Sequence, residues 1–247
     1  MGMVVVVTSG KGGAGKSTVA AGLGAAVCRR GRSVLLLDMD QGLRCLDLML
    51  GVSAQSVFDV GDLLKGRCTA ADAVLRVPGC DGLYVLPAPP EAGAVDSIEA
   101  MKTLACKLSP VFDAVLVDSP AGIGRGFCLS AQAATGALVV ATPDPVCVRD
   151  GAVTARLLRQ MGVSESRLVI NRFQPRLIRE GLLPDFDEMI DAVGLQLVGA
   201  VPDDPAVLAA AARGEPLTAG PAARAFDRIA LRLEGKDGPL PPLHRLS

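Results

Sequence analysis

The feature that most constrains this chain is a glycine-rich loop between an apolar strand and an amphipathic helix. The valines of Val4–Val7 precede Thr8 and Ser9, and the helix is expected to begin at Lys16. The loop reads Gly10, Lys11, Gly12, Gly13, Ala14, Gly15, Lys16 and Ser17. Its glycines permit close approaches that a Cβ atom would block, so the loop amides and the helix N-terminus can form a concave anion site. This order of strand, loop and helix predicts a Walker A phosphate loop.

Such a loop implies ATP and Mg²⁺ as the ligands of the site. Lys16 is expected to reach the terminal phosphates, and the Ser17 hydroxyl is expected to coordinate Mg²⁺. Thr18 follows in the helix and belongs to the predicted ATP-binding residues. Lys11 is an additional lysine at the start of the loop, where it adds a positive charge beside the phosphates. The loop therefore predicts an enzyme that binds and hydrolyses ATP.

Aspartates follow two of the apolar runs of the chain. Asp38 and Asp40 come after residues 34–37, and Asp118 comes after residues 114–117. Because ligands of open parallel sheets bind at the carboxyl ends of strands, these carboxylates should face the Mg²⁺–phosphate region. Asp118 stands in a Walker B pattern and is expected to hold Mg²⁺ through water, with Asp38 contributing to the metal shell. Asp40 is expected to orient the attacking water.

Apolar runs of strand length alternate with helical segments along the chain. Strands are predicted over residues 4–8, 33–38, 83–86, 114–118, 137–142, 167–170 and 196–201. Helices are predicted over residues 16–30, 57–64, 70–75, 95–108, 126–134, 146–161, 185–193, 205–213 and 222–233. This alternation indicates right-handed β-α-β units. The expected fold is a single α/β domain of three layers, in which helices cover both faces of a mainly parallel, twisted β-sheet.

Composition supports a single domain in a reducing compartment. Hydrophobic residues make up 50% of the chain and charged residues 21%, which is enough apolar side chain for a large core. The formal net charge of −1 gives no signal for nucleic-acid binding. The seven cysteines include no Cys-x-x-Cys pair, which argues against a disulfide framework and against zinc. The domain is expected to span residues 1–234, before an irregular, proline-rich tail over residues 235–247.

The loop and the segment after the second strand resemble one family of ATPases. The order Lys-Gly-Gly-x-Gly-Lys-Ser at residues 11–17 is similar to the deviant Walker A loops of the MinD/ParA group. Residues 38–51 read Asp-Met-Asp-Gln-Gly-Leu-Arg-Cys-Leu-Asp-Leu-Met-Leu-Gly and resemble the switch I region of the MinD family of division-site ATPases. Similar segments continue in order at residues 83–88, 118–123, 148–150, 169–173 and 197–204. The resemblance therefore covers most of the chain, from residue 3 to residue 233.

The resemblance implies roles that the residues alone do not. In the family, the first lysine of the loop crosses a dimer interface to the partner's nucleotide, which makes Lys11 a catalytic residue beside Lys16 and Asp40. Carried over by position, Asn171 hydrogen-bonds adenine, while Arg172, Pro202 and Asp203 close the base pocket. The family also implies a homodimer in the ATP state, slow turnover that partners stimulate, and a role in placing the division site. Its partners would be a division inhibitor and an ATPase activator.

The expected location is the cytoplasm, because the chain opens on strand residues without a basic leader. MinD proteins usually end in a short basic amphipathic helix that binds anionic membrane, which leaves a peripheral place on the inner face of the cell membrane open. Here Arg224, Arg228 and Arg232 are expected to form the solvated face of a docked terminal helix. The prolines at 239, 241 and 242 leave only residues 243–247 after them, too short a segment for an effective interfacial helix.

Other functions on the same scaffold stay open at this point. One is a related positioning ATPase that works in the cytosol without direct membrane binding, such as a ParA-type partition protein or a flagellar-number regulator. Another is a metal-cluster carrier, which would need paired cysteines at a dimer interface. A third is a nucleotide-binding adaptor without catalysis, which would have no need to retain Lys11, Lys16, Asp40 and Asp118.

Overall fold

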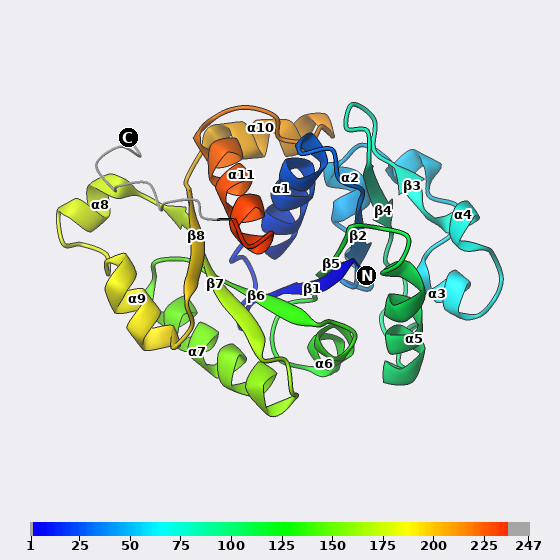
Figure 1. Ribbon diagram of the computed structural model, residues 1–247, viewed down its shortest axis with the longest axis horizontal. Helices are drawn as coiled ribbons and strands as arrows, with labels where there is room; N and C mark the ends of the chain where they lie inside the picture. The colour runs from blue at the N-terminus through cyan, green and yellow to red at the C-terminus, as the bar shows by residue number, and fades with distance from the viewer. Residues whose placement is uncertain (1, 237–247) are drawn as a thin grey trace.

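The computed structural model describes residues 2–236 of the chain, and these residues form an eight-stranded sheet (Figure 1). The strands are β1 (Met3–Thr8), β2 (Val34–Asp38), β3 (Leu75–Arg76), β4 (Leu83–Leu86), β5 (Ala114–Asp118), β6 (Gly136–Ala141), β7 (Glu165–Phe173) and β8 (Leu197–Pro202). Their order is β3-β4-β2-β5-β1-β6-β7-β8, and every neighbouring pair is parallel except β3 and β4. The predicted α/β fold with a mainly parallel sheet is confirmed.

Helices cover both faces of this sheet, with α1, α10 and α11 on one face and α6 and α7 on the other (Figure 1). The helices are α1 (Lys16–Arg29), α2 (Leu46–Met49), α3 (Val60–Leu64), α4 (Ala70–Ala73), α5 (Ile98–Leu108), α6 (Arg125–Gln132), α7 (Pro145–Gln160), α8 (Pro175–Arg179), α9 (Phe186–Val193), α10 (Pro205–Arg213) and α11 (Pro221–Leu233). A single 3₁₀ turn, η1 (Ser53–Gln55), follows α2 within the described chain. The three layers match the predicted architecture.

Strand β1 shows why the sheet lies at the centre of the fold. Its side chains alternate between the two faces, so Val5 and Val7 join the core beneath α1 and α11. Val4 and Val6 join the core on the face of α6. All of these valines are buried, and each stabilises the fold by about 1.5–3 kcal/mol through the apolar area it removes from water. An unbroken apolar run is therefore what a strand covered on both faces requires.

The prediction was wrong for the short elements β3, α2 and α8. The helix predicted over residues 70–75 ends at Ala73, and Leu75 begins β3, which pairs with β4 in antiparallel orientation. Helices α2 and α8 were not predicted either. They have four and five residues, and a segment of that length completes too few turns for a helical hydrophobic period to appear in the sequence.

Two helices begin later than predicted because a polar residue caps each of them. The helix expected from residue 57 begins at Val60, since the Asp59 carboxylate accepts hydrogen bonds from the N–H groups of the first turn. The helix expected from residue 95 begins at Ile98, since the Ser97 hydroxyl accepts a hydrogen bond in the same way. Elsewhere the predicted bounds of the longer elements agree with the structure to within a few residues.

Helix α11 is docked on α1 and β8, as the sequence predicted for the terminal helix. The Phe226 and Ile229 side chains are fully buried in this contact. A Cβ atom on Gly22 of α1 would lie 2.3 Å from Cε2 of Phe226, and one on Gly199 of β8 would lie 2.4 Å from Cγ1 of Ile229. The close approach of α11 thus depends on glycine at both positions. Arg224 is exposed on the outer side of this helix.

The described chain ends shortly after α11. The predicted irregular tail, residues 235–247, lies outside the described residues from residue 237 onward, so that prediction has no counterpart in the structure. Among residues 2–236, no helix has both the length and the apolar character that a membrane span requires.

Candidate functional site

The topology brings the predicted site residues to one edge of the sheet. Strand β5 lies between β1 and β2, so their carboxyl ends are neighbours. Asp118 pairs in register with Val7 on one side and with Asp38 on the other. The Met39 N–H donates to the Asp118 carbonyl oxygen over 2.9 Å, and the Ser119 N–H donates to that of Val7 over 3.1 Å. The loop after β1 and the aspartates after β2 and β5 therefore meet, as predicted.

The glycine-rich loop is held in a shape that leaves its helix end open. Gly13 and Gly15 adopt φ values of +84° and +91°, which a residue with a Cβ atom rarely adopts. Within the described residues, no side chain caps the N-terminus of α1 after Gly15. The first N–H groups of that helix are therefore free to bind an anion.

Lys16 and Asp118 are two ionisable groups that lie buried at this edge without a direct hydrogen bond or ion pair among the described residues. Lys16 is 7% exposed, and it makes neither a hydrogen bond nor an ion pair with any described residue. Both carboxylate oxygens of Asp118 are buried and accept no hydrogen bond from the described chain. Burial and the charge of Asp38 raise the pKa of Asp118 to about 8, which nearby Ser17 and Lys16 only partly offset. A buried cation and a buried carboxylate left in this state are costly unless a ligand completes the site.

These two groups test whether Mg²⁺ and a phosphate chain fit the site. The uncapped helix and the Lys16 ammonium offer positive charge for phosphates. The orphaned Asp118 oxygens and the nearby Ser17 hydroxyl are oxygen ligands of the kind that Mg²⁺ prefers. Mg²⁺ is usually held by one or two carboxylates together with substrate phosphates and water. The residues present therefore fit a magnesium nucleotide.

Asp38 organises the segment that follows β2. One of its carboxylate oxygens accepts a hydrogen bond from the Asp40 N–H over 2.8 Å. The other accepts from the N–H groups of Cys45 and Leu46 over 3.1 and 3.2 Å. Burial raises the pKa of Asp38 to about 6, although these hydrogen bonds oppose the rise. In the structure Asp38 closes the turn that presents Asp40, and its predicted place in the metal shell stays a prediction.

Asp40 lies at the edge of the same site with a free carboxylate. Its side chain is partly buried, and burial raises its pKa while the charge of Lys16 lowers it. No described residue donates a hydrogen bond to the Asp40 carboxylate or forms an ion pair with it. The carboxylate is thus available to a water molecule, as expected for the predicted role.

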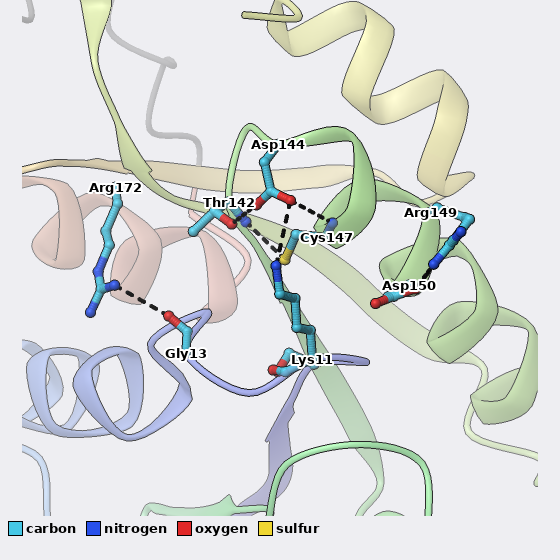
Figure 2. Close-up of polar contacts among 9 residues, drawn as sticks. Lys11, Gly13, Thr142, Asp144, Cys147, Arg149, Asp150 and Arg172 are labelled. Atoms are coloured by element: carbon cyan, nitrogen blue, oxygen red, sulfur yellow. Dashed lines mark hydrogen bonds and ion pairs between the residues drawn. The ribbon is translucent and has the colours of Figure 1, made fainter.

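Lys11 turns away from the phosphate cradle and pairs with the start of α7 (Figure 2). Its ammonium nitrogen lies 3.8 Å from Oδ1 of Asp144, and both side chains are about half exposed. Asp144 also accepts hydrogen bonds from the Thr142 hydroxyl and the Cys147 N–H. The sequence analysis missed Asp144, although an aspartate directly before a proline at a helix start is a recognisable N-cap signal.

The predicted base-pocket residues lie where β7 and β8 reach the loop. The Asn171 amide nitrogen donates to the Ala14 carbonyl oxygen over 2.8 Å. Arg172 donates to the Gly13 carbonyl oxygen over 3.2 Å, as Figure 2 shows. Asn171 is buried, but its amide oxygen accepts no hydrogen bond within residues 2–236. Pro202 ends β8, and the Asp203 N–H after it donates to Phe173. The structure brings the predicted set together, and it adds a support role for Asn171 beneath the loop.

A family model and individual relatives match this chain. The model described as the CobQ/CobB/MinD/ParA nucleotide binding domain matches residues 5–217. The septum site-determining protein MinD of a Synechocystis species is 37% identical over 245 residues, which cover 97% of this chain and 92% of the relative.

Solved structures give the same result. The MinC:MinD cell division protein complex of Aquifex aeolicus superposes with a TM-score of 0.90 and 34% identity over 97% of this chain and 98% of that one. MinD of Pyrococcus horikoshii complexed with Mg-ADP has a TM-score of 0.85 and 25% identity over 95% of this chain and 96% of that one.

Proposed function

This chain belongs to the CobQ/CobB/MinD/ParA family of nucleotide-binding proteins, and we propose that it is a MinD-type ATPase that serves division-site placement as an ATP-dependent dimerisation switch. Its relatives carry the name septum site-determining protein, and they match nearly the whole chain.

One observation carries the proposal. Lys16 is a buried ammonium group that forms no direct ion pair, and Asp118 is a buried carboxyl group whose oxygens accept no hydrogen bond from the described residues, at the same edge of the sheet. A magnesium nucleotide would supply phosphates as the anionic partner of Lys16 and Mg²⁺ as the cationic partner of Asp118. A structural role alone would not explain two such costly groups side by side.

Each residue of the site has a distinct task in hydrolysis. Lys16 and the N–H groups of the loop bind the phosphates and hold them in place. Asp118 and Ser17 would hold Mg²⁺, which would supply positive charge next to the phosphates. Asp40 orients the attacking water and accepts its proton. Asn171 offers its unbonded amide oxygen to the amino group of adenine, with Arg172, Pro202 and Asp203 around the base.

Dimerisation completes the switch through Lys11. In the single chain Lys11 is held by Asp144, so it cannot also serve a second site. An exposed ion pair of this kind contributes about 0–1 kcal/mol, so it breaks readily when a better anion is available. The phosphates of a second copy would be that anion. Lys11 then couples ATP binding in one copy to contact with the other.

The partners and location follow from the same family. MinD of Aquifex aeolicus has been solved in a MinC:MinD cell division protein complex, which supports a division-inhibitor partner for this chain. An activator that stimulates slow basal turnover is the second proposed partner. The proposed ATPase domain is residues 1–234. Helix α11 buries its apolar side on α1 and β8, so it has no free apolar face for a membrane. The proposed place of action is the cytoplasm or the inner face of the cell membrane.

The proposal is tested by ATP turnover of the purified protein in Mg²⁺. Lys16→Ala and Asp118→Asn should each lower kcat/KM by at least about a hundredfold, because each removes a charge that the phosphates or the metal need. Lys102→Ala is the matched control, since Lys102 is a half-exposed lysine on α5. Turnover that persists in Lys16→Ala, or that falls equally in the control, would contradict the assignment of the site.

A further inference from the structure

The segment that joins β4 to α5 lies against both loops that carry the catalytic carboxylates. We define residues 87–97 as the bridging loop. The Gly42 N–H, from the segment after β2, donates to Pro89 of this loop over 3.0 Å. From the segment after β5, Arg125 at the start of α6 donates to the Asp96 carbonyl oxygen over 2.8 Å. The bridging loop thus connects the segment of Asp40 with that of Asp118.

Gln41 makes two further connections to the bridging loop, both to Val95. Its amide nitrogen donates to the Val95 carbonyl oxygen over 3.0 Å, and its amide oxygen accepts from the Val95 N–H over 2.9 Å. One side chain therefore satisfies both backbone groups of Val95, as a neighbouring β-strand would. Val95 is 3% exposed, so the loss of this side chain would leave two buried polar groups unpaired, which is costly.

Asp40, the next residue, depends on its backbone for its position. Nothing in the described chain holds its carboxylate by a hydrogen bond or an ion pair. Its N–H is held by Asp38, and its carbonyl oxygen accepts from the N–H groups of Leu43 and Arg44. The pair of hydrogen bonds between the Gln41 side chain and Val95, which we call the Gln41 clasp, ties this turn to the bridging loop beside the Gly42–Pro89 hydrogen bond. The direction of the Asp40 carboxylate therefore depends on how firmly this turn is anchored.

Apart from Gln41, the bridging loop accepts hydrogen bonds at Pro87 and Pro89 from the N–H groups of Val60 and Gly42, and at Asp96 from Arg125. The Arg125–Asp96 contact lies on the surface, with both side chains more than 70% exposed, and such pairs contribute little. A cavity of about 390 Å³ lies between the bridging loop and the two carboxylate segments, and Met39, Gln41, Val95, Pro120 and Leu129 contribute to its lining. The loop thus has room to shift when the clasp is broken.

We propose that Gln41 is a positioning residue that holds the Asp40 carboxylate in place for ATP hydrolysis by clasping Val95 of the bridging loop. The inference rests on the proposed ATPase function. Gln41 would act in that function through the backbone of the Asp40 turn, without touching the nucleotide or the metal. A misplacement of about 1 Å is enough to lower a rate by about a hundredfold. Loss of the clasp should accordingly act on turnover and leave the binding of ATP unchanged.

The test compares basal turnover and ATP binding in three variants of the full chain. Gln41→Leu removes both hydrogen bonds at nearly constant size and should lower kcat by about tenfold or more, with KM for ATP within about twofold of the parent. Gln41→Glu keeps the acceptor for the Val95 N–H but loses the donor to the Val95 carbonyl oxygen. Its kcat should lie between that of the parent and that of Gln41→Leu. Gln55→Leu is the matched control, because Gln55 is exposed on the turn η1, and it should match the parent.

Unfolding midpoints measured beside turnover separate positioning from general damage. A kcat of Gln41→Leu within about twofold of the parent overturns the inference. So does a parallel loss of kcat and ATP affinity, which would mean that the whole site is disturbed. If Gln41→Leu does not fold, Gln41→Glu decides by the same criteria. If the parent itself does not hydrolyse ATP, the proposed function fails and the inference about Gln41 fails with it.

Discussion

The ammonium group of Lys11 lies 3.8 Å from the carboxylate of Asp144, so the first lysine of the phosphate loop is paired within its own chain (Figure 2). Partial burial raises the pKa of Asp144, but hydrogen bonds from Thr142 and Cys147 and the charge of Lys11 lower it below its ordinary value overall. The carboxylate is therefore ionised at neutral pH. Its contact holds Lys11 over α7 in the single chain and competes with any second partner for the same lysine.

Asp144→Asn should strengthen ATP-dependent dimerisation. The substitution removes the charge that holds Lys11, while asparagine still caps α7 as aspartate does. Since an exposed ion pair contributes up to about 1 kcal/mol and two such pairs break in each dimer, the dimer dissociation constant should fall by up to about thirtyfold. Sedimentation equilibrium in ATP measures it. A dissociation constant that rises would show that Asp144 supports the dimer instead of competing with it.

Lys11→Ala should separate nucleotide binding from dimerisation. The Lys11 side chain pairs with Asp144 in the single chain, so the affinity of the monomer for ATP should stay within about twofold of the parent. Dimers in ATP should disappear, because the proposed trans contact is lost. Fluorescent ATP binding and sedimentation on the same sample measure the two effects. Loss of monomer affinity without loss of dimers would contradict the trans role.

Gly15→Ala should damage the phosphate loop more than Gly13→Ala. Both positions have positive φ, which costs a residue with a Cβ atom about 1–2 kcal/mol. At Gly15 the new Cβ would also lie 2.3 Å from the amide nitrogen of Asn171, whereas at Gly13 it would meet open space. ATP affinity should therefore fall by at least about tenfold in Gly15→Ala and by less in Gly13→Ala. Equal affinities would contradict the contact between Asn171 and the loop.

The end of α11 should lose stability in acid through Glu234. Its carboxylate accepts two hydrogen bonds from Arg30, over 2.8 and 3.0 Å, and Arg30 and Lys236 lower its pKa from 4.5 to about 2. A depressed pKa contributes stability that is present above pH 4.5 and is lost as pH falls towards 2. Glu234→Gln should lower the free energy of unfolding by about 1 kcal/mol at pH 7, and the difference should shrink by pH 3. A difference independent of pH would contradict this origin.

The sequence predicted those parts of the site whose residues are neighbours in the chain or follow a rule of parallel sheets. Strand, glycine loop and helix are contiguous, so their signal is complete within one short stretch of sequence. Asp118 and Asp38 were placed correctly because adjacent parallel strands end at one edge. These predictions needed no knowledge of long-range packing.

Contacts between distant segments could not be predicted in this way. Gln41 and Val95 are 54 residues apart, and a glutamine in a loop gives no sign of the backbone that it will clasp. The same holds for Lys11 and Asp144, which meet because β6 lies beside β1. Strand β3 was missed because its two residues are held by pairing with β4, and no periodic pattern fits into that length.

The most direct test of the ATP-dependent switch is the sedimentation of Asp40→Ala in Mg²⁺ with ATP and with ADP. The variant binds ATP but lacks the carboxylate that positions the water, so it should accumulate as a dimer of twice the 25.3 kDa monomer mass in ATP and stay monomeric in ADP. The parent should form the same dimer and return to monomer as ATP is consumed. If both proteins bind ATP and both remain monomeric, the chain is not a dimerisation switch.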